Sequence, residues 1–248
     1  MLNDLPLARK TIYVTGTQKV QTIEELVQAN GGKVKSFPLI DVQECIAADD
    51  AEKLAHSKSY EWLIFTSQNA VESFVKKLHR AKQNVDTFLC KIAAVGTKTA
   101  KALENSGFTV EFMPSIFSAD VFVKEFPLVA GKGRCLFLRG NLAKTTIRDA
   151  LACDEWTVYE TVESTKHIQA LAESLIQEEE PIVIFASPSA VKVYAQYIVP
   201  DFDWSYITIA SIGHITTAEL KSYGATVDVQ PDTYTMKAVV EHLIIGGL

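Results

Sequence analysis

The sequence has few of the features that mark disulfide-linked, zinc-binding or membrane-spanning proteins. Its cysteines stand far apart, without a CxxC pair or zinc-binding Cys/His spacing, and are Cys45, Cys90, Cys135 and Cys153. This pattern predicts small core residues in a reducing compartment. No apolar run approaches the roughly 20 residues of a membrane span, and the N-terminal segment MLNDLPLARK lacks a signal-peptide pattern. We therefore expect a cytoplasmic protein without a membrane segment.

Positive charge is also scarce, and several nucleotide-binding and hydrolytic motifs are missing. The chain has 24 Lys and Arg against 30 Asp and Glu, a net charge of −6 without a basic block, which argues against a nucleic-acid partner. Neither the GxGxxG dinucleotide fingerprint nor the GxxxxGKS/T phosphate loop occurs. A GxSxG nucleophile elbow is absent as well. We therefore expect no bound nucleotide and no serine-dependent hydrolysis.

What the chain does contain is a stretch that occurs twice. Residues 63–71 read LIFTSQNAV, and residues 183–191 read VIFASPSAV. Each copy is an apolar run that ends in small polar residues and then resumes with helical spacing. This pattern predicts a buried parallel strand followed by a helix, whose first turn presents Ser67 or Ser187 and unpaired backbone N–H groups.

A second pair of segments continues the repeat. IAAVGTKTAKAL at 92–103 matches IASIGHITTAEL at 209–220, and the helix-capping Ser118 corresponds to Thr235. A period of about half the chain is far longer than that of stacked repeats, and it favours a duplicated domain. With 248 residues, 48% of them hydrophobic, the chain is long enough for two medium-sized cores.

Strands and helices alternate along the sequence, which predicts parallel sheets covered on both faces. The predicted strands are 11–15, 34–37, 62–65, 92–95, 109–112, 135–138, 156–162, 182–185, 207–211 and 226–229. Extended segments at Pro38 and Trp156 occupy equivalent places in the two halves. They suggest that the chain crosses between two bodies there and returns.

Small polar residues follow several of the predicted strands. In open parallel sheets the ligand lies beyond the carboxyl ends of the strands, where helix N-termini point. The candidates supply hydroxyls, an amide and backbone N–H groups, which suit an anionic ligand. They are Ser67, Gly96, Thr99, Gly140, Asn141, Ser187, Gly213 and Thr216. Taken singly, the two serines are ordinary helix caps, but two equivalent sets of donors favour two ligand-binding rims.

Tyr159 is a further candidate, because it is expected on an extended connector and not in a core strand. A phenol is protonated at neutral pH and donates a hydrogen bond or a proton to a leaving oxygen. The alternative is an aromatic residue that packs the connector. His214, beside Gly213, is more typical of a surface or capping residue than of a general base.

Taken in order, these segments resemble the uroporphyrinogen-III synthase family. The resemblance covers nearly the whole chain and rests on IFTSQNAV, VGTKT, VYET, IFASPSAV, IGHITT and the closing GATVDVQPDTYTMKAVVEHL. It implies two flavodoxin-like, internally duplicated α/β domains, one formed by 1–37 with 164–248 and the other by 44–155. The segments 38–43 and 156–163 would be the two connector strands.

The resemblance also implies a reaction. Hydroxymethylbilane, a linear tetrapyrrole with many carboxylates, loses water, and its terminal ring is inverted through a spiro intermediate as the macrocycle closes to uroporphyrinogen III. The pyrrole chain supplies the electron push as hydroxide leaves, so that neither a metal nor an organic cofactor is implied. The protein must chiefly orient and shield its substrate.

The resemblance also implies roles for individual residues of the site. Tyr159 matches the tyrosine proposed to assist departure of the hydroxyl. The matches to paired threonines and to substrate contacts are Thr99, Thr216, Ser67, Ser187, Gly96 and Gly213. Two positions depart from the family's pattern, since Gly16 stands where many members have arginine and Ile215 replaces a polar or small residue.

Two other functions stay open. A non-catalytic, two-lobed binding protein for a small anionic ligand would share this architecture. A nucleotide-dependent reductase would retain NAD(P)H on titration, which we expect not to occur. For the favoured function we expect a small polycarboxylate substrate, no nucleic-acid or membrane partner, and a monomeric protein.

Overall fold

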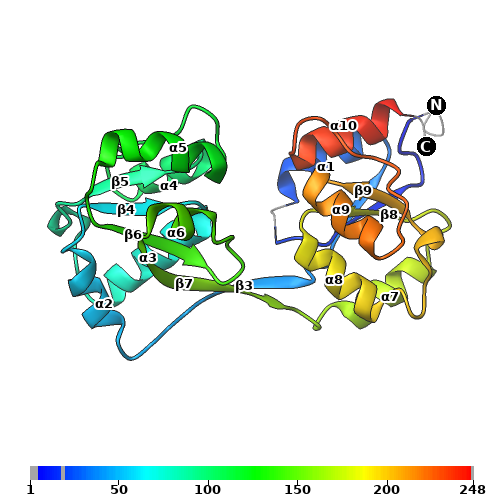
Figure 1. Cartoon of the computed structure of the whole chain (residues 1–248). Helices are drawn as coiled ribbons and strands as arrows, with labels where there is room; N and C mark the ends of the chain where they lie inside the picture. Colours follow the sequence, from blue (N-terminus) through cyan, green and yellow to red (C-terminus); the bar gives the residue numbers. More distant parts are fainter. Residues whose placement is uncertain (1–4, 18–19, 247–248) are drawn as a thin grey trace. The chain divides into compact units, whose positions relative to one another are not determined.

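The computed structural model describes residues 5–17 and 20–246 and divides the chain into two compact α/β units (Figure 1). Both ends of the chain, Met1–Asp41 and Val162–Leu248, form what we call the terminal unit, and Val42–Thr161 forms the inserted unit. Parts of the predicted domain 1–37 with 164–248 lie outside the described residues, namely 1–4, 18–19 and 247–248.

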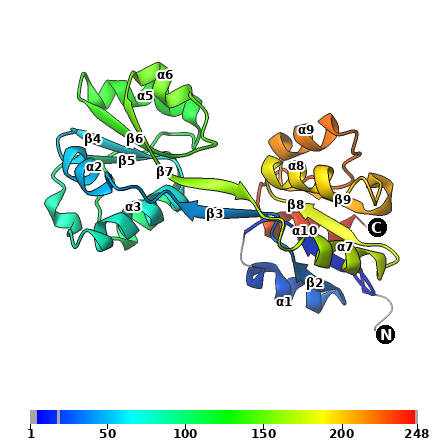
Figure 2. The ribbon, with the colours of Figure 1, turned by 90° about the horizontal axis from the view of Figure 1, so that it is seen from below.

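The terminal unit is built on a four-stranded parallel sheet in the order β2-β1-β8-β9. Its strands are β1 (Thr11–Val14), β2 (Lys33–Ser36), β8 (Ile182–Phe185) and β9 (Thr208–Ser211). Its helices are α1 (Gln21–Ala29), α7 (Ile168–Ile176), α8 (Pro188–Tyr197), α9 (His214–Ser222) and α10 (Met236–Ile245), with a 3-10 turn at Trp204–Tyr206. Successive residues of β1 face opposite sides: Ile12 packs in the same cluster as α1 and α10, and Tyr13 in the cluster of α7, α8 and α9. Both faces of the sheet are therefore covered (Figure 2).

The inserted unit is built on a five-stranded sheet in the order β3-β7-β6-β4-β5. Its strands are β3 (Ile40–Glu44), β4 (Trp62–Phe65), β5 (Lys91–Ala94), β6 (Cys135–Gly140) and β7 (Asp154–Glu163). Its helices are α2 (Asp50–Ser57), α3 (Gln68–Arg80), α4 (Thr97–Asn105), α5 (Ala119–Ala130) and α6 (Thr146–Leu151), with a 3-10 turn at Val85–Thr87. Leu63 and Phe65 pack with α3 and α4, whereas Trp62 and Ile64 pack with α5 and α6. This alternation buries β4 on both faces.

β7 belongs to the inserted sheet for more of its length than the sequence suggested. It pairs in parallel with β6 from Asp154 as far as Tyr159, whose partner is Gly140. The first part of the segment 156–163 therefore lies in the sheet. Tyr159 accordingly stands in a hydrogen-bonded strand, where the prediction placed it on a connector.

Carboxylates interrupt both sheets at equivalent places. Two of the predicted strands are reduced to single bridged pairs, namely 109–112 and 226–229. Glu111 Oε2 accepts a hydrogen bond from the backbone N–H of Ile92 (2.6 Å), and Asp228 Oδ2 accepts one from Ile209 (2.7 Å). In a regular parallel ladder a backbone carbonyl would accept each of these N–H groups. Because a carboxylate accepts it here, each segment pairs with its neighbouring strand at one position only.

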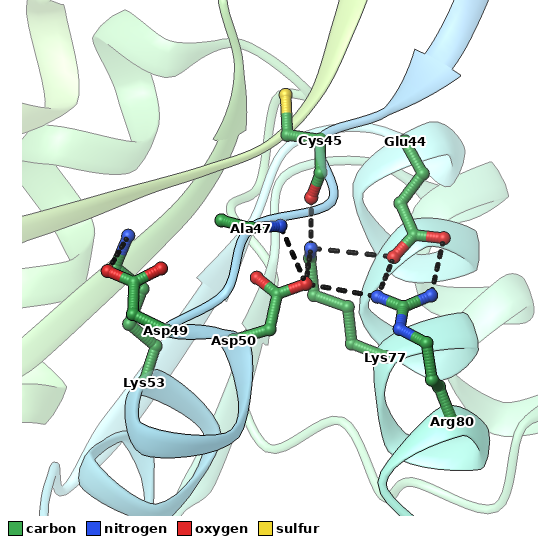
Figure 3. A network of polar contacts seen from close by, with 8 residues as sticks. All are labelled: Glu44, Cys45, Ala47, Asp49, Asp50, Lys53, Lys77 and Arg80. Atoms are coloured by element: carbon green, nitrogen blue, oxygen red, sulfur yellow. Dashed lines mark hydrogen bonds and ion pairs between the residues drawn. The ribbon is translucent and has the colours of Figure 1, made fainter.

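A cluster of ion pairs holds the end of β3 to α2 and α3 (Figure 3). The side chain of Lys77, on α3, is fully buried and lies 2.8 Å from Asp50 Oδ2 and 3.4 Å from Glu44 Oε1. It also donates to the carbonyl oxygen of Cys45. Arg80, one turn later, pairs with Glu44 (2.6 Å) and Asp50 (3.0 Å). Two cations thus neutralise two carboxylates that the fold has largely removed from water.

The four cysteines are free; Cys90 and Cys153 are buried, and Cys45 and Cys135 are half-buried. Within residues 5–17 and 20–246, no helix is both long enough and apolar enough to cross a membrane. The same residues contain no group of three or more His, Cys, Asp or Glu side chains placed to hold a metal ion.

Candidate active site

In the inserted unit, Ser67 and Tyr159 are joined by a hydrogen bond. Ser67 is the N-cap of α3, and its extended backbone (φ −146°, ψ 151°) turns Oγ toward the first turn, where it accepts the N–H of Ala70 (3.2 Å). The same hydroxyl donates to the phenol oxygen of Tyr159 (3.1 Å). Because the serine supplies that proton, the O–H of the tyrosine is free for another acceptor.

Gly140 lies directly behind the ring of Tyr159. A Cβ added at Gly140 would lie 2.6 Å from Cε2 and 2.7 Å from the phenol oxygen. Real side chains do not approach so closely, and glycine at this position therefore leaves room for the ring of Tyr159. The space above Gly140 and the hydrogen bond from Ser67 together set the position of the Tyr159 phenol.

Asn141 and Arg139, on either side of Gly140, use their polar groups inside the unit. The Asn141 amide bonds both backbone groups of Thr161, accepting its N–H (2.9 Å) and donating to its carbonyl (3.3 Å). The Arg139 guanidinium is buried, pairs with Glu155 and donates to the carbonyl of Gly140 (3.1 Å). Both residues therefore hold the strands that carry Tyr159.

The N-terminus of α4 presents a second group of predicted residues. Gly96 is the N-cap of this helix, and Thr99, in the first turn, is 4% exposed. The Thr99 hydroxyl has no hydrogen-bond partner among the residues that the structure describes. The side chain of Phe117, which is 55% exposed, lies 3.8 Å from the position of a Cβ at Gly96.

In the terminal unit, Ser187, Gly213 and Thr216 line one cavity of about 240 Å³. The lining residues are Ala186, Ser187, Pro188, Ile212, Gly213, His214, Ile215, Thr216 and Tyr234. Ser187 caps α8 and accepts the N–H of Ala190 (3.3 Å). Thr216 is 3% exposed, and no described residue bonds its hydroxyl. The fold thus gathers the three predicted residues of this unit at the N-termini of α8 and α9.

Tyr234 and His214 belong to the same cavity and were not predicted as site residues. Carbon atoms of the Tyr234 ring lie 2.8 Å from the position of a Cβ at Gly213, and the Tyr234 oxygen lies 2.7 Å from His214 Nδ1. The signal that would have found Tyr234 is the repeat. Phe117 is its equivalent at the same offset that relates Gly96 to Gly213, although only the Cβ of Phe117 comes near Gly96, whereas the ring of Tyr234 lies against Gly213.

A larger cavity, of about 570 Å³, lies between α2 and the first residues of β7. Tyr60 donates to Asp154 there (2.7 Å), and burial together with this carboxylate raises the pKa of Tyr60 to about 12. None of the predicted site residues, all of which are described, lines this cavity. It adjoins the amino end of β7, whereas ligands of parallel sheets bind beyond the carboxyl ends. We therefore do not include it in the candidate site.

Comparison with known proteins places this arrangement in a family. The family described as Uroporphyrinogen-III synthase HemD matches residues 21–241. A uroporphyrinogen-III synthase of Synechococcus elongatus is 28% identical over 251 residues, covering 95% of this chain and 94% of that protein. A uroporphyrinogen-III synthase of Chlorobaculum parvum is 29% identical over 249 residues, covering 94% and 99%.

Solved structures agree with the fold. The crystal structure of uroporphyrinogen-III synthetase from Helicobacter pylori aligns with a TM-score of 0.66 at 22% identity, covering 94% of this chain and 97% of that one. A mutant uroporphyrinogen III synthase from Thermus thermophilus aligns with a TM-score of 0.63 at 15% identity, covering 93% and 96%. With a family match over most of its length, the chain belongs to the uroporphyrinogen-III synthase family.

Proposed function

We propose that this chain converts hydroxymethylbilane into uroporphyrinogen III, with loss of water and inversion of the terminal pyrrole ring. The observation that carries the proposal is the phenol of Tyr159, held between Gly140 and Ser67 with no acceptor for its O–H among the described residues. A phenol prepared in this way is suited to protonate a leaving oxygen.

The proposed reaction begins when Tyr159 donates its proton to the terminal hydroxyl of the substrate. Water departs as the adjacent pyrrole supplies electrons, and an azafulvene cation remains. The substituted carbon of the terminal ring attacks this cation and forms the spiro intermediate. The older bond from that carbon to its bridge then breaks, and the bridge rejoins the ring at its unsubstituted carbon. Loss of a proton there restores the pyrrole and balances the proton given to water.

The remaining predicted residues are proposed to hold the substrate's carboxylates. The hydroxyls of Thr99 and Thr216 are without protein partners among the described residues, and the backbone N–H groups at the starts of α4, α8 and α9 add further donors. Such donors bind carboxylates without a cation for each charge. Gly140, Asn141 and Ser67 have a second role in this proposal, because they position Tyr159.

Orientation is the protein's main contribution in this proposal. The linear substrate can close directly, without ring inversion, to the type I isomer. The protein must hold the terminal ring so that its substituted carbon reaches the cation first and must keep water from the cation meanwhile.

The test is incubation of hydroxymethylbilane with and without the protein, followed by oxidation and chromatography of the porphyrins. The proposal predicts that the type III isomer predominates when the protein is present. Type I product alone, in the same amount as without protein, would favour a binding protein for anionic ligands.

A further inference from the structure

The terminal unit carries a tyrosine that is placed much like Tyr159 but has no assigned role. The ring of Tyr234 lies on Gly213, at the N-terminus of α9, as the ring of Tyr159 lies on Gly140. Its oxygen is 2.7 Å from His214 Nδ1, as the oxygen of Tyr159 is 3.1 Å from the Ser67 hydroxyl. In each unit, a neighbouring polar side chain therefore orients a phenol at the carboxyl end of the sheet.

The sequence repeat places an aromatic residue without a hydroxyl at the position equivalent to Tyr234. Phe117 occupies the equivalent position of the inserted unit and lies beside Gly96 without a hydroxyl. Only the Cβ of Phe117 comes near its glycine, at 3.8 Å from the position of a Cβ at Gly96, so that the contact between ring and glycine is particular to Tyr234 and Gly213. Among the described residues the hydroxyl of Tyr234 has His214 as its only hydrogen-bond partner, and Tyr234 is 51% exposed at the edge of a cavity. The contacts of the ring with Gly213 involve its carbon atoms and not the hydroxyl, which is therefore available to a ligand in the cavity.

The cavity beside Tyr234 has the chemistry of a site for one arm of an amphipathic acid. Its volume of about 240 Å³ is below the range of roughly 300–1,000 Å³ that whole ligands occupy. Ile212 and Ile215 give it apolar walls, while the buried Thr216 contributes a hydroxyl that no described residue bonds. The shape and lining therefore suit part of a substrate that extends beyond it.

We propose that Tyr234, oriented by His214, binds a carboxylate side chain of the linear tetrapyrrole in this cavity; the inference rests on the proposed function. When His214 Nδ1 carries a hydrogen, it donates to the phenol oxygen, and the phenol O–H is free to donate to a carboxylate. When Nδ1 lacks a hydrogen, the phenol donates to it and has no proton left for the ligand. Binding of the carboxylate therefore selects the form in which the imidazole is the donor.

The first test is steady-state kinetics of Tyr234→Phe with hydroxymethylbilane. This variant keeps the ring against Gly213 and removes only the hydroxyl, so that the fold is retained. We expect KM to rise about tenfold, as for loss of a hydrogen bond to a charged group, with kcat unchanged, because the lost contact is made in ground state and transition state alike. A KM equal to that of wild type would overturn the inference.

His214 supplies a second, independent test. His214→Ala removes the donor that orients the phenol, and it should raise KM as much as Tyr234→Phe does. His214→Asn keeps an amide N–H near the place of Nδ1 and should restore most of the affinity. In the double variant the two losses should not multiply, because both remove one interaction. Independent, multiplying effects would contradict an orienting role for His214.

Tyr223→Phe is the matched control, because Tyr223 is an exposed tyrosine at the opposite end of α9, outside the cavity. Its KM should equal that of wild type, and circular dichroism should show the same melting for all variants. If wild type forms no type III isomer, the proposed function fails and this inference with it. If wild type forms the isomer and Tyr234→Phe binds substrate equally well, only this inference fails.

Discussion

Gly140 and Tyr159 are paired across β6 and β7, and the ring of Tyr159 occupies the space that a side chain at Gly140 would need. Residues paired on neighbouring parallel strands have their side chains close together. The ring of Tyr159 fits over its partner position because that position is a glycine. The phenol that we propose as the proton donor is therefore placed by the sheet and not by a loop. Rigid elements hold reacting groups more accurately than loops do.

Gly140→Ala is expected to displace the Tyr159 ring, because the added Cβ would meet Cε2 at 2.6 Å. A displacement of about 1 Å can lower kcat about 100-fold. Gly96→Ala is the steric control for folding, since its Cβ would meet only Phe117, at 3.8 Å. Melting curves compare the folding of both variants, the kcat of Gly140→Ala checks this expectation, and a wild-type kcat in Gly140→Ala would contradict it.

Tyr159→Phe is expected to lower kcat about 100-fold, within the range for loss of a general acid. Binding of the product should change much less, because the ring remains and the transferred proton has no part in the product complex. Comparison of kcat with the product's dissociation constant checks this. Equal losses in both would count against proton donation by Tyr159.

Ser67→Ala removes a helix cap and the hydrogen bond to Tyr159 in one change. Loss of the cap should lower the free energy of unfolding by about 1 kcal/mol, and loss of the orienting bond should lower kcat about tenfold. Ser118, which caps α5 by accepting the N–H of Val121 (3.2 Å), is the matched control. Ser118→Ala should cost similar stability and leave kcat unchanged. If both variants retain full turnover, Ser67 does not orient the phenol.

Lys77→Met should destabilise the inserted unit by about 3–5 kcal/mol, because it leaves Asp50 and Glu44 buried with one cation fewer. Lys53, which pairs with Asp49 at 3.0 Å on the surface of α2, provides the control. Lys53→Met should change stability by less than about 0.5 kcal/mol. Urea unfolding followed by tryptophan fluorescence measures both, and equal effects would mean that burial adds nothing to the Lys77 cluster.

The same cluster predicts sensitivity to acid. Burial favours a higher pKa for Glu44 and Asp50, but hydrogen bonds and charge from Arg80 and Lys77 outweigh it, so that both pKa values lie below the ordinary 4.5 and 3.8. A lowered pKa stabilises the folded state above the unfolded-state value, and this stability is lost as pH falls through the folded-state value.

The stability gap between wild type and Lys77→Met should therefore be constant above about pH 5 and shrink as pH falls below the ordinary carboxyl values. Urea unfolding at several pH values measures this gap. A gap at about pH 3 as large as that at about pH 7 would show that the carboxylates do not stabilise the cluster.

Local patterns in the sequence predict most of the fold. The apolar runs at 62–65 and 182–185 become strands with those bounds, because a short run of consecutive apolar residues suits a strand that is buried on both faces. Ser67 and Ser187 cap helices as expected. Segment 109–112 forms only a single bridged pair, because the backbone N–H of Ile92 donates to the side chain of Glu111 and not to a backbone carbonyl.

The features that the sequence does not predict depend on contacts between distant segments. From the helical pattern alone, the side chain of Lys77 would be expected in solvent. Its burial depends on Glu44 and Asp50, which come from earlier elements of the chain. Tyr234 and Gly213 are separated in the sequence by α9 and by the segment 226–229, whose Asp228 bonds the N–H of Ile209. Periodicity describes one element at a time, and it does not pair a tyrosine with the glycine on which its ring lies.

The central claim is that the protein breaks one carbon–carbon bond of its substrate and forms it anew at another ring position. Hydroxymethylbilane with carbon-13 in both atoms of that bond, the bridge carbon and the terminal-ring carbon attached to it, tests this directly by nuclear magnetic resonance of the product. The account predicts that the one-bond coupling between the two labels disappears when the protein forms the product. A product that keeps this coupling would show that the ring was never inverted, and would contradict the account.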